Sequence, residues 1–109
     1  MIYYTYILRC EDNSLYTGIT TDLNRRFEEH KSQGEKGAKY TRTHKVMKLE
    51  AAWVSENRIS ASRLEYYIKK LTKKQKEKLI VSGDLESILG NKIEAETYLR
   101  IRVSSIYNI

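Results

Sequence analysis

Glu65 is the residue whose position most clearly requires a chemical partner. In the segment from Ile59 to Leu71, a helical step places Glu65 beside an apolar stripe made of Ala61, Leu64, Ile68 and Leu71. A carboxylate partly withdrawn from water costs several kcal/mol unless a cation or hydrogen-bond donors compensate it. Two kinds of partner fit: a metal ion, or a Lys or Arg in a structural ion pair. Because Cys10 is the only cysteine, any metal ion must use oxygen or His ligands.

Arg26 and His30 are the candidates on an earlier predicted helix, from Asp22 to Lys31. A step of about 100° per residue gives this helix an apolar face that contains Leu23, Phe27 and His30. Arg26 falls roughly 70° from the centre of that face, whereas Arg25 points to the opposite side. We therefore expect Arg25 to be a surface charge and Arg26 to lie at the rim of the core. A His beside an apolar face is at least as often a structural residue as a functional one.

The tyrosines near the N-terminus have an ordinary explanation as well as a functional one. Tyr4, Tyr6 and Leu8 share one face of a predicted strand, and Tyr16 and Gly18 share a face of the next. Tyrosines on strands are usually packing residues, and a strand glycine mainly indicates the close approach of another group. A chemical role for these residues follows only from the combination of all the candidates.

The elements that must position these residues indicate one small α+β domain. The predicted order is β-β-α-β-α-α, with three antiparallel strands flanked by helices. The strands cover residues 3–9, 14–20 and 46–55, and the helices cover residues 22–31, 59–71 and 73–81, with Thr20 or Thr21 as the first N-cap. The Gly-containing stretch from Ser32 to His44 is expected to be a mobile loop. Beyond Gly83, residues 84–89 are expected to be helical, and residues 98–109 fit a helix or a strand.

Composition limits the function classes. The 109 residues carry a formal net charge of +6, from 20 basic and 14 acidic residues, which favours anionic partners such as nucleic acid. Six lysines between Lys69 and Lys78 fit a solvated helix face better than a binding stripe. No apolar run approaches the roughly 20 residues of a bilayer span, and Met1 to Arg9 lacks the features of a signal peptide. We expect a cytoplasmic protein with no membrane partner.

Taken together, the candidates resemble the GIY-YIG nuclease superfamily. The resemblance rests on Thr5-Tyr6, on Tyr16-Thr17-Gly18, on Arg26 ten residues after Tyr16, on His30 four residues later, and on Glu65 in a downstream helix. The stretch YTYILRCEDNSLYTGITTDLNRRFEEH is similar to a small, single-domain bacterial branch of that superfamily. The likeness extends over about residues 3 to 80. It implies a nuclease-like domain at residues 1–82 and a C-terminal extension at residues 83–109.

The resemblance implies a role for each residue. Tyr6 and Tyr16 match the two motif tyrosines, Arg26 matches the helix arginine, and Glu65 matches the ligand of a divalent metal, all placed around a scissile phosphate. The physics agrees, because a phosphorane-like transition state gathers negative charge that a guanidinium and a cation neutralise. Glu65 suits Mg²⁺ (or Mn²⁺), with waters and the phosphate as the other ligands. His30 is expected to orient or assist Tyr16.

Two questions about the motifs stay open at this point. A tyrosine near a metal and an arginine can have its pKa lowered and accept a proton from the attacking water, but either Tyr6 or Tyr16 fits that role. The motifs also depart from the family pattern, since Tyr4 replaces the glycine of the first motif and Thr17 replaces the isoleucine of the second. Many active members carry an Asn well after the glutamate, and the next Asn here is Asn91.

The sequence therefore predicts a divalent-metal-dependent nuclease that hydrolyses nucleic-acid phosphodiester bonds, with DNA as the expected substrate. The alternative is a nucleic-acid-binding module of the same fold with weak or no catalysis. The basic residues of the expected loop are predicted to contact the nucleic-acid backbone, namely Lys36, Lys39, Arg42 and Lys45. Site specificity is expected to come from a protein partner or from the structure of the substrate.

Overall fold

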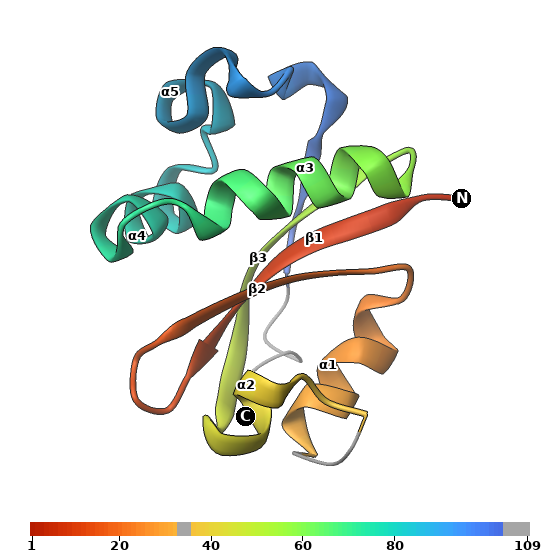
Figure 1. Ribbon diagram of the computed structural model, residues 1–109, viewed down its shortest axis with the longest axis vertical. Helices are drawn as coiled ribbons and strands as arrows, with labels where there is room; N and C mark the ends of the chain where they lie inside the picture. The colour runs from red at the N-terminus through yellow and green to blue at the C-terminus, as the bar shows by residue number, and fades with distance from the viewer. Residues whose placement is uncertain (33–35, 104–109) are drawn as a thin grey trace.

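The computed structural model describes residues 1–32 and 36–103, so residues 33–35 of the expected loop and residues 104–109 of the tail lie outside the described chain. The fold is of the predicted α+β class, with one antiparallel sheet between two groups of helices (Figure 1). No helix in the described ranges is long and apolar enough to cross a membrane. The elements in chain order are β1 (Tyr3–Cys10), β2 (Leu15–Thr20), α1 (Leu23–Lys31), α2 (Lys39–Thr43), β3 (Val46–Ser55), α3 (Arg58–Lys69), α4 (Lys73–Ser82), α5 (Leu85–Leu89), the 3-10 turns η1 (Gly90–Lys92) and η2 (Ala95–Thr97), and β4 (Leu99–Ile101).

The predicted hairpin of β1 and β2 is confirmed. The strands pair antiparallel, with Tyr6 opposite Gly18 and Leu8 opposite Tyr16. Asn13 supplies the left-handed backbone conformation that the tight connection needs, with φ of 70°. This register fixes which side chains of the two strands share a face of the sheet.

The prediction of three strands was wrong, because the sheet has four strands in the order β2-β1-β3-β4. The fourth strand pairs antiparallel with β3 and places Arg100 opposite Trp53. The Arg100 guanidinium carbon lies 5.7 Å from the centre of the Trp53 ring. The strand lies in the range 98–109, for which the sequence left helix and strand open, because three residues, two of them exposed, carry too little alternation to decide between them.

The helices cover the two faces of the sheet unequally (Figure 1). One face lies against α3, α4 and α5, and its buried cluster is apolar: Ile7, Ala51, Trp53, Leu64, Ile68, Leu79, Leu85, Leu89 and Ile93. The other face lies against α1 and α2, and its cluster consists of Tyr6, Leu8, Cys10, Leu23, Phe27, Val46, Leu49 and Ala52. Residues from the segment after α4 therefore help to build the core.

Two local predictions need correction. The N-cap of α1 is Asp22 and not Thr20 or Thr21, because the Asp22 side chain accepts a hydrogen bond from the Arg25 backbone N–H at 3.1 Å. The Thr20 hydroxyl instead accepts a hydrogen bond from the Asp22 backbone N–H at 3.1 Å, which fixes the backbone that leads into α1. The expected mobile loop also contains a helix, α2, whose five residues are too few to give a periodic pattern.

Candidate active site

The candidate residues of the first hairpin and of α1 gather on the face of the sheet that α1 and α2 cover, at β1 and the edge strand β2. Because Tyr6 pairs with Gly18 and Leu8 with Tyr16, the side chains of these residues share that face. Helix α1 packs its buried residues on the same face and brings His30 and Arg26 with them. The hairpin register and the helix period together therefore position four of the five predicted site residues.

Tyr6 and His30 form a buried hydrogen-bonded pair. The Tyr6 hydroxyl lies 2.7 Å from His30 Nε2, and His30 Nδ1 lies 2.7 Å from Thr41 Oγ1. Only 2% of Tyr6 and none of His30 is exposed to solvent. The sequence predicted Tyr16 as the partner of His30, but the hydrogen bond goes to Tyr6. The Tyr16 ring instead packs beside the imidazole, with 5.2 Å between ring centres.

Burial controls how this pair ionises. It raises the pKa of the Tyr6 hydroxyl well above its usual range, and the neighbouring Tyr16 and Glu65 add to the rise. A hydrogen bond and the positive charge from Arg26 oppose this effect. Burial also lowers the pKa of His30 to about 4, with a further contribution from the Arg26 charge. At neutral pH, Tyr6 is therefore a phenol and His30 a neutral imidazole.

Arg26 and Arg25 differ as the sequence predicted. The Arg26 side chain is 24% exposed and that of Arg25 is 59% exposed. Arg26 Nη1 lies 2.9 Å from Glu29 Oε1, and it also donates a hydrogen bond to the backbone oxygen of Lys36. Burial disfavours the charge of Arg26, but Glu29 and Tyr6 outweigh it and raise its pKa. A permanent positive charge is thus held beside the Tyr6 hydroxyl.

Gly18 has no side chain, and the Tyr6 ring occupies the space that a side chain would need. A Cβ atom at position 18 would lie 2.5 Å from the Tyr6 hydroxyl oxygen and 3.1 Å from Cε2 of Tyr16. The Tyr6 ring cannot withdraw easily, since it is buried and its hydroxyl is bonded to His30. The glycine is therefore needed for close approach, as the strand position suggested.

Glu65 comes from α3, which packs on the face of the sheet opposite to α1 and α2. Its Oε2 lies 3.3 Å from Lys69 Nζ, which in turn lies 6.0 Å from the centre of the Tyr16 ring. Its charge also acts on the pKa of Tyr6. The charge of Glu65 therefore reaches Tyr6, and Glu65 has an ion-pair partner, which is one of the two kinds of partner that the sequence left open.

The expected Mg²⁺ or Mn²⁺ needs oxygen ligands, and Glu65 is the candidate carboxylate at the site. Within residues 1–32 and 36–103, no three His, Cys, Asp or Glu side chains cluster closely enough to hold a metal ion on their own. A single carboxylate is nevertheless a sufficient protein ligand for Mg²⁺, which keeps several waters and binds substrate phosphates. The Glu65 side chain is 23% exposed and accessible for that purpose. Glu65 therefore fits a metal ion whose remaining ligands are waters and the phosphate oxygens of a substrate.

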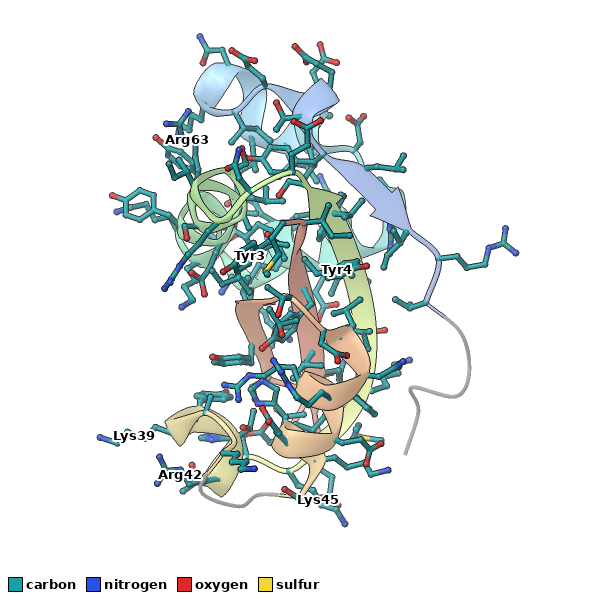
Figure 2. All side chains as sticks on the ribbon, turned by 90° about the vertical axis from the view of Figure 1, so that its right-hand side faces the viewer. Tyr3, Tyr4, Lys39, Arg42, Lys45 and Arg63 are labelled. Carbon is teal, nitrogen blue, oxygen red and sulfur yellow. The ribbon has the colours of Figure 1, made fainter. Side chains whose placement is uncertain are left out.

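The predicted basic residues do not all point the same way. Figure 2 shows Lys39 and Arg42 projecting from α2 to one side of the molecule, whereas Lys45 points in a different direction. All three are exposed, and so is Lys36, whose backbone oxygen binds Arg26. Lys39 and Arg42 are thus the pair that extends the site outward from α2.

Sequence reasoning missed two residues of α2 that contact the site. Thr41 is fully buried against His30, and the Tyr40 ring stacks on Tyr16 with 5.9 Å between centres and 22° between planes. The Tyr40 ring also stacks on His44 at 3.9 Å. A short polar loop gives no periodic signal that would identify a buried Thr, so only the fold reveals these contacts.

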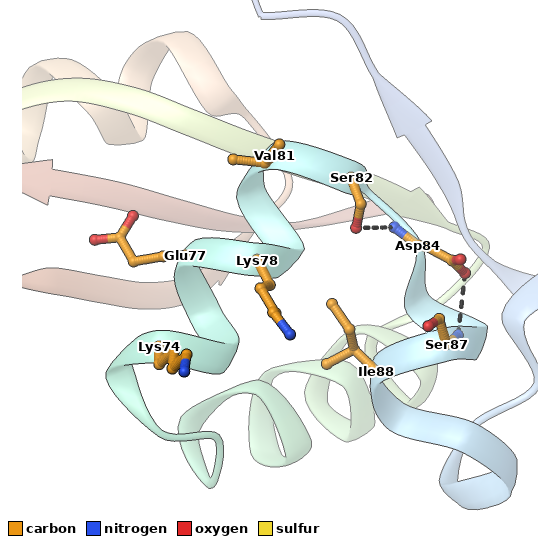
Figure 3. Close-up of a pocket in the computed structure, with 8 residues that line it drawn as sticks. All are labelled: Lys74, Glu77, Lys78, Val81, Ser82, Asp84, Ser87 and Ile88. Carbon is orange, nitrogen blue, oxygen red and sulfur yellow. Dashed lines mark hydrogen bonds between the residues drawn. The ribbon is translucent and has the colours of Figure 1, made fainter.

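A separate cavity of about 560 Å³ lies between α4 and α5 (Figure 3). Val81 and Ile88 are its apolar lining residues, Ser82 accepts a hydrogen bond from the Asp84 backbone N–H, and Asp84 caps α5 by accepting from the Ser87 N–H. Its other lining residues are Lys74, Glu77, Lys78 and Ser87, and none of the motif residues lines it, so it is separate from the candidate site.

Comparison with known protein families identifies the family of this chain. The model of the GIY-YIG catalytic domain matches residues 2–78. The chain belongs to the GIY-YIG family. The prediction from the motifs is therefore confirmed, and the matched range spans β1 to α4 and contains every predicted site residue.

Bacterial relatives of this GIY-YIG chain are also close in length. It is 51% identical over 84 residues to the UPF0213 protein FN1575 of Fusobacterium nucleatum, covering 77% of this chain and 82% of that protein. It is 46% identical over 99 residues to the UPF0213 protein BH0048 of Halalkalibacterium halodurans, covering 91% and 97%. A solution structure of the UPF0213 protein BH0048 from Bacillus halodurans matches 74% of this chain and 84% of that one, with 44% identity and a TM-score of 0.46.

Proposed function

We propose that this chain is a divalent-metal-dependent nuclease that hydrolyses phosphodiester bonds in nucleic acid, with DNA as its substrate. The observation that carries the proposal is the Tyr6 hydroxyl bonded to a neutral His30 at 2.7 Å, with the Arg26 charge beside it. A hydroxyl that has a proton acceptor on one side and a guanidinium on the other is suited to proton transfer at an anionic centre. Membership of the GIY-YIG family supports a phosphodiester as that centre.

Arg26 is proposed to neutralise the charge that develops on the phosphate. Its ion pair with Glu29 and its bond to the Lys36 backbone oxygen hold the guanidinium in one orientation. A donor oriented in advance avoids reorganisation during the reaction, which is the main source of electrostatic catalysis. Arg25, which is exposed and points away, has no such role.

Tyr6 is proposed to accept the proton of the attacking water. Its raised pKa disfavours a free phenolate, so the Tyr6 oxygen accepts a proton only as its own proton moves to His30 Nε2. Tyr16, half-buried between His30 and Tyr40, is proposed to orient the phosphate. This assigns the two tyrosine roles that the sequence left open.

Glu65 is proposed to hold the divalent metal, with Lys69 as its ion-pair partner when no metal is bound. The metal would supply Lewis-acid stabilisation of the phosphate oxygens. Lys39 and Arg42 on α2 are proposed to contact the neighbouring phosphates, because they are exposed beside Tyr40 and Thr41.

The test is a nicking assay on plasmid, single-stranded and branched DNA and on RNA, with Mg²⁺ or Mn²⁺ against EDTA. Arg26→Ala is expected to lower cleavage by about 10²- to 10³-fold, the usual effect of removing one charge-stabilising donor. Arg25→Ala is the matched control, because it removes the adjacent arginine, which also contacts Glu29. Equal activity in the two variants would contradict the proposed role of Arg26.

A second candidate function is nucleic-acid binding with weak or no catalysis. It is favoured by the burial of Tyr6, of which 2% is exposed, and by the ion pair that already occupies Glu65. In this case the protein would bind DNA with a salt-dependent affinity but leave every substrate uncut with either metal. The same assay, run beside a binding titration, separates the two functions.

A further inference from the structure

The hydrogen bonds around His30 favour one direction. Thr41 Oγ1 lies 3.1 Å from the backbone oxygen of Ala38, which can only accept, so the single hydroxyl proton of Thr41 points there. In this direction Thr41 accepts a hydrogen bond from His30, and Nδ1 of the imidazole carries the proton. A neutral imidazole has one N–H group, so Nε2 is left to accept from the Tyr6 hydroxyl.

We propose that Thr41 is a positioning residue that fixes His30 in the tautomer with the proton on Nδ1, so that Nε2 is available to take the proton of Tyr6. The other ring nitrogen of a His is commonly set in this way by its hydrogen-bond partner. Thr41 touches neither the substrate nor the reacting atoms, and it acts through His30. The part of this inference that concerns catalysis rests on the proposed nuclease function, whereas the tautomer itself does not.

The position of Thr41 in the fold links this tautomer to the proposed DNA contacts. Thr41 lies on the short helix α2 between Tyr40, which stacks on Tyr16, and Arg42, which is exposed. Its hydroxyl is anchored to Ala38, the N-cap residue of the same helix. Helix α2 therefore both exposes Lys39 and Arg42 and holds the hydroxyl that orients His30.

The first test measures the tautomer directly in the full chain. The sequence contains two histidines, so nitrogen NMR of protein labelled in its imidazole rings gives two sets of ring signals, and His44→Gln assigns them. We expect the His30 signals of the wild type at pH 7 to show a protonated Nδ1 and an unprotonated Nε2. A protonated Nε2 in the wild type would overturn the proposal without any variant.

The second test uses a matched pair of substitutions. Thr41→Val keeps the shape but removes the acceptor, so His30 is expected to lose its preference for the Nδ1 proton, whereas Thr41→Ser retains the hydroxyl and the tautomer. Cleavage by Thr41→Val should fall by roughly 10- to 100-fold in kcat with little change in KM, and Thr41→Ser should restore it. Thermal melts of both variants identify a loss that is merely structural.

The outcomes separate this inference from the proposed function. A wild type that never cuts, yet has the expected tautomer and loses it in Thr41→Val, would contradict the nuclease proposal and support the role of Thr41 at His30. A folded Thr41→Val variant that keeps the wild-type tautomer and the wild-type kcat would overturn the inference, because Thr41 would then set neither.

Discussion

The two faces of the sheet use their buried side chains in opposite ways. Against α3, α4 and α5 the cluster is apolar and surrounds Trp53 and Leu79. Against α1 and α2 the core contains Tyr6, His30 and Thr41 joined in a hydrogen-bonded chain. Apolar contacts are non-directional and tolerate approximate packing, whereas a buried polar chain is stable only when every partner is in place. We infer that the first face mainly supplies stability and the second mainly supplies chemistry.

The largest expected effect concerns Glu65, which comes from a helix of the apolar face but is proposed to serve the other face. Glu65→Gln should lower cleavage by on the order of 10³-fold and remove metal binding, because the carboxylate charge is lost. Stability should change by less than about 1 kcal/mol, since only a partly exposed i,i+4 pair with Lys69 disappears. Nicking assays and thermal melts with and without Mg²⁺ measure both quantities.

Glu86→Gln, at an exposed site on α5, is the control for this charge change. A Glu65→Gln variant that melts well below the wild type yet still cuts would refute the metal role. It would show instead that Glu65 is a structural partner of Lys69, the alternative that the sequence left open.

A substitution that creates a cavity in the apolar cluster tests whether this face mainly supplies stability. Leu79→Ala should cost about 2–5 kcal/mol of stability, because Leu79 is fully buried in the cluster beneath α4. The cleavage rate of the molecules that remain folded should be unchanged. Denaturant unfolding and activity below the transition measure the two effects. Val81→Ala on the same helix is the control, since Val81 is 85% exposed and should change stability by less than about 0.5 kcal/mol.

The polar face is tested by pH. Burial lowers the pKa of His30 from 6.5 to about 4, so the unfolded chain binds a proton here that the folded chain does not. The stability that His30 contributes is fully present above pH 6.5 and is lost as the pH falls toward 4. At 1.36 kcal/mol per pH unit, the loss is about 3 kcal/mol. Denaturant unfolding between these pH values measures it.

His30→Gln should remove most of this pH dependence, whereas His44→Gln should leave it. His44 is the suitable comparison because its side chain is 34% exposed and lies 3.6 Å from Asp12 at the surface. If the two variants gave the same stability profile, the assignment of the polar chain as the pH-sensitive part of the fold would be wrong.

The smallest expected effect concerns the surface beside the polar face. Replacing Lys39 and Arg42 together with Ala should reduce the slope of log affinity against log salt by about 1 for each phosphate contact that is lost. Binding titrations at several salt concentrations measure the slope. Replacing Lys74 and Lys78 on α4 removes the same charge beside the other face, and it should leave the slope unchanged if α2 is the binding surface.

The sequence determined the parts of the molecule that follow from local periodicity and residue type. The period of α1 placed Arg26 at the rim and Arg25 at the surface, and the structure agrees with both positions. The bounds of β3 were predicted correctly from its apolar and β-branched content. The motif residues identified the family, because their types and order along the chain carry that information without any knowledge of contacts.

Only the tertiary structure decided which of these residues touch. Whether His30 bonds to Tyr6 or to Tyr16 depends on the angle at which α1 crosses the sheet, and the sequence does not encode that angle locally. The burial of Thr41 and the pairing of β4 depend on partners far along the chain, His30 and β3. Such contacts arise from packing between elements, which overrides the weak preferences of short segments. The residues of the proposed chemistry were therefore visible in the sequence, whereas the direction of its hydrogen bonds was set by the fold.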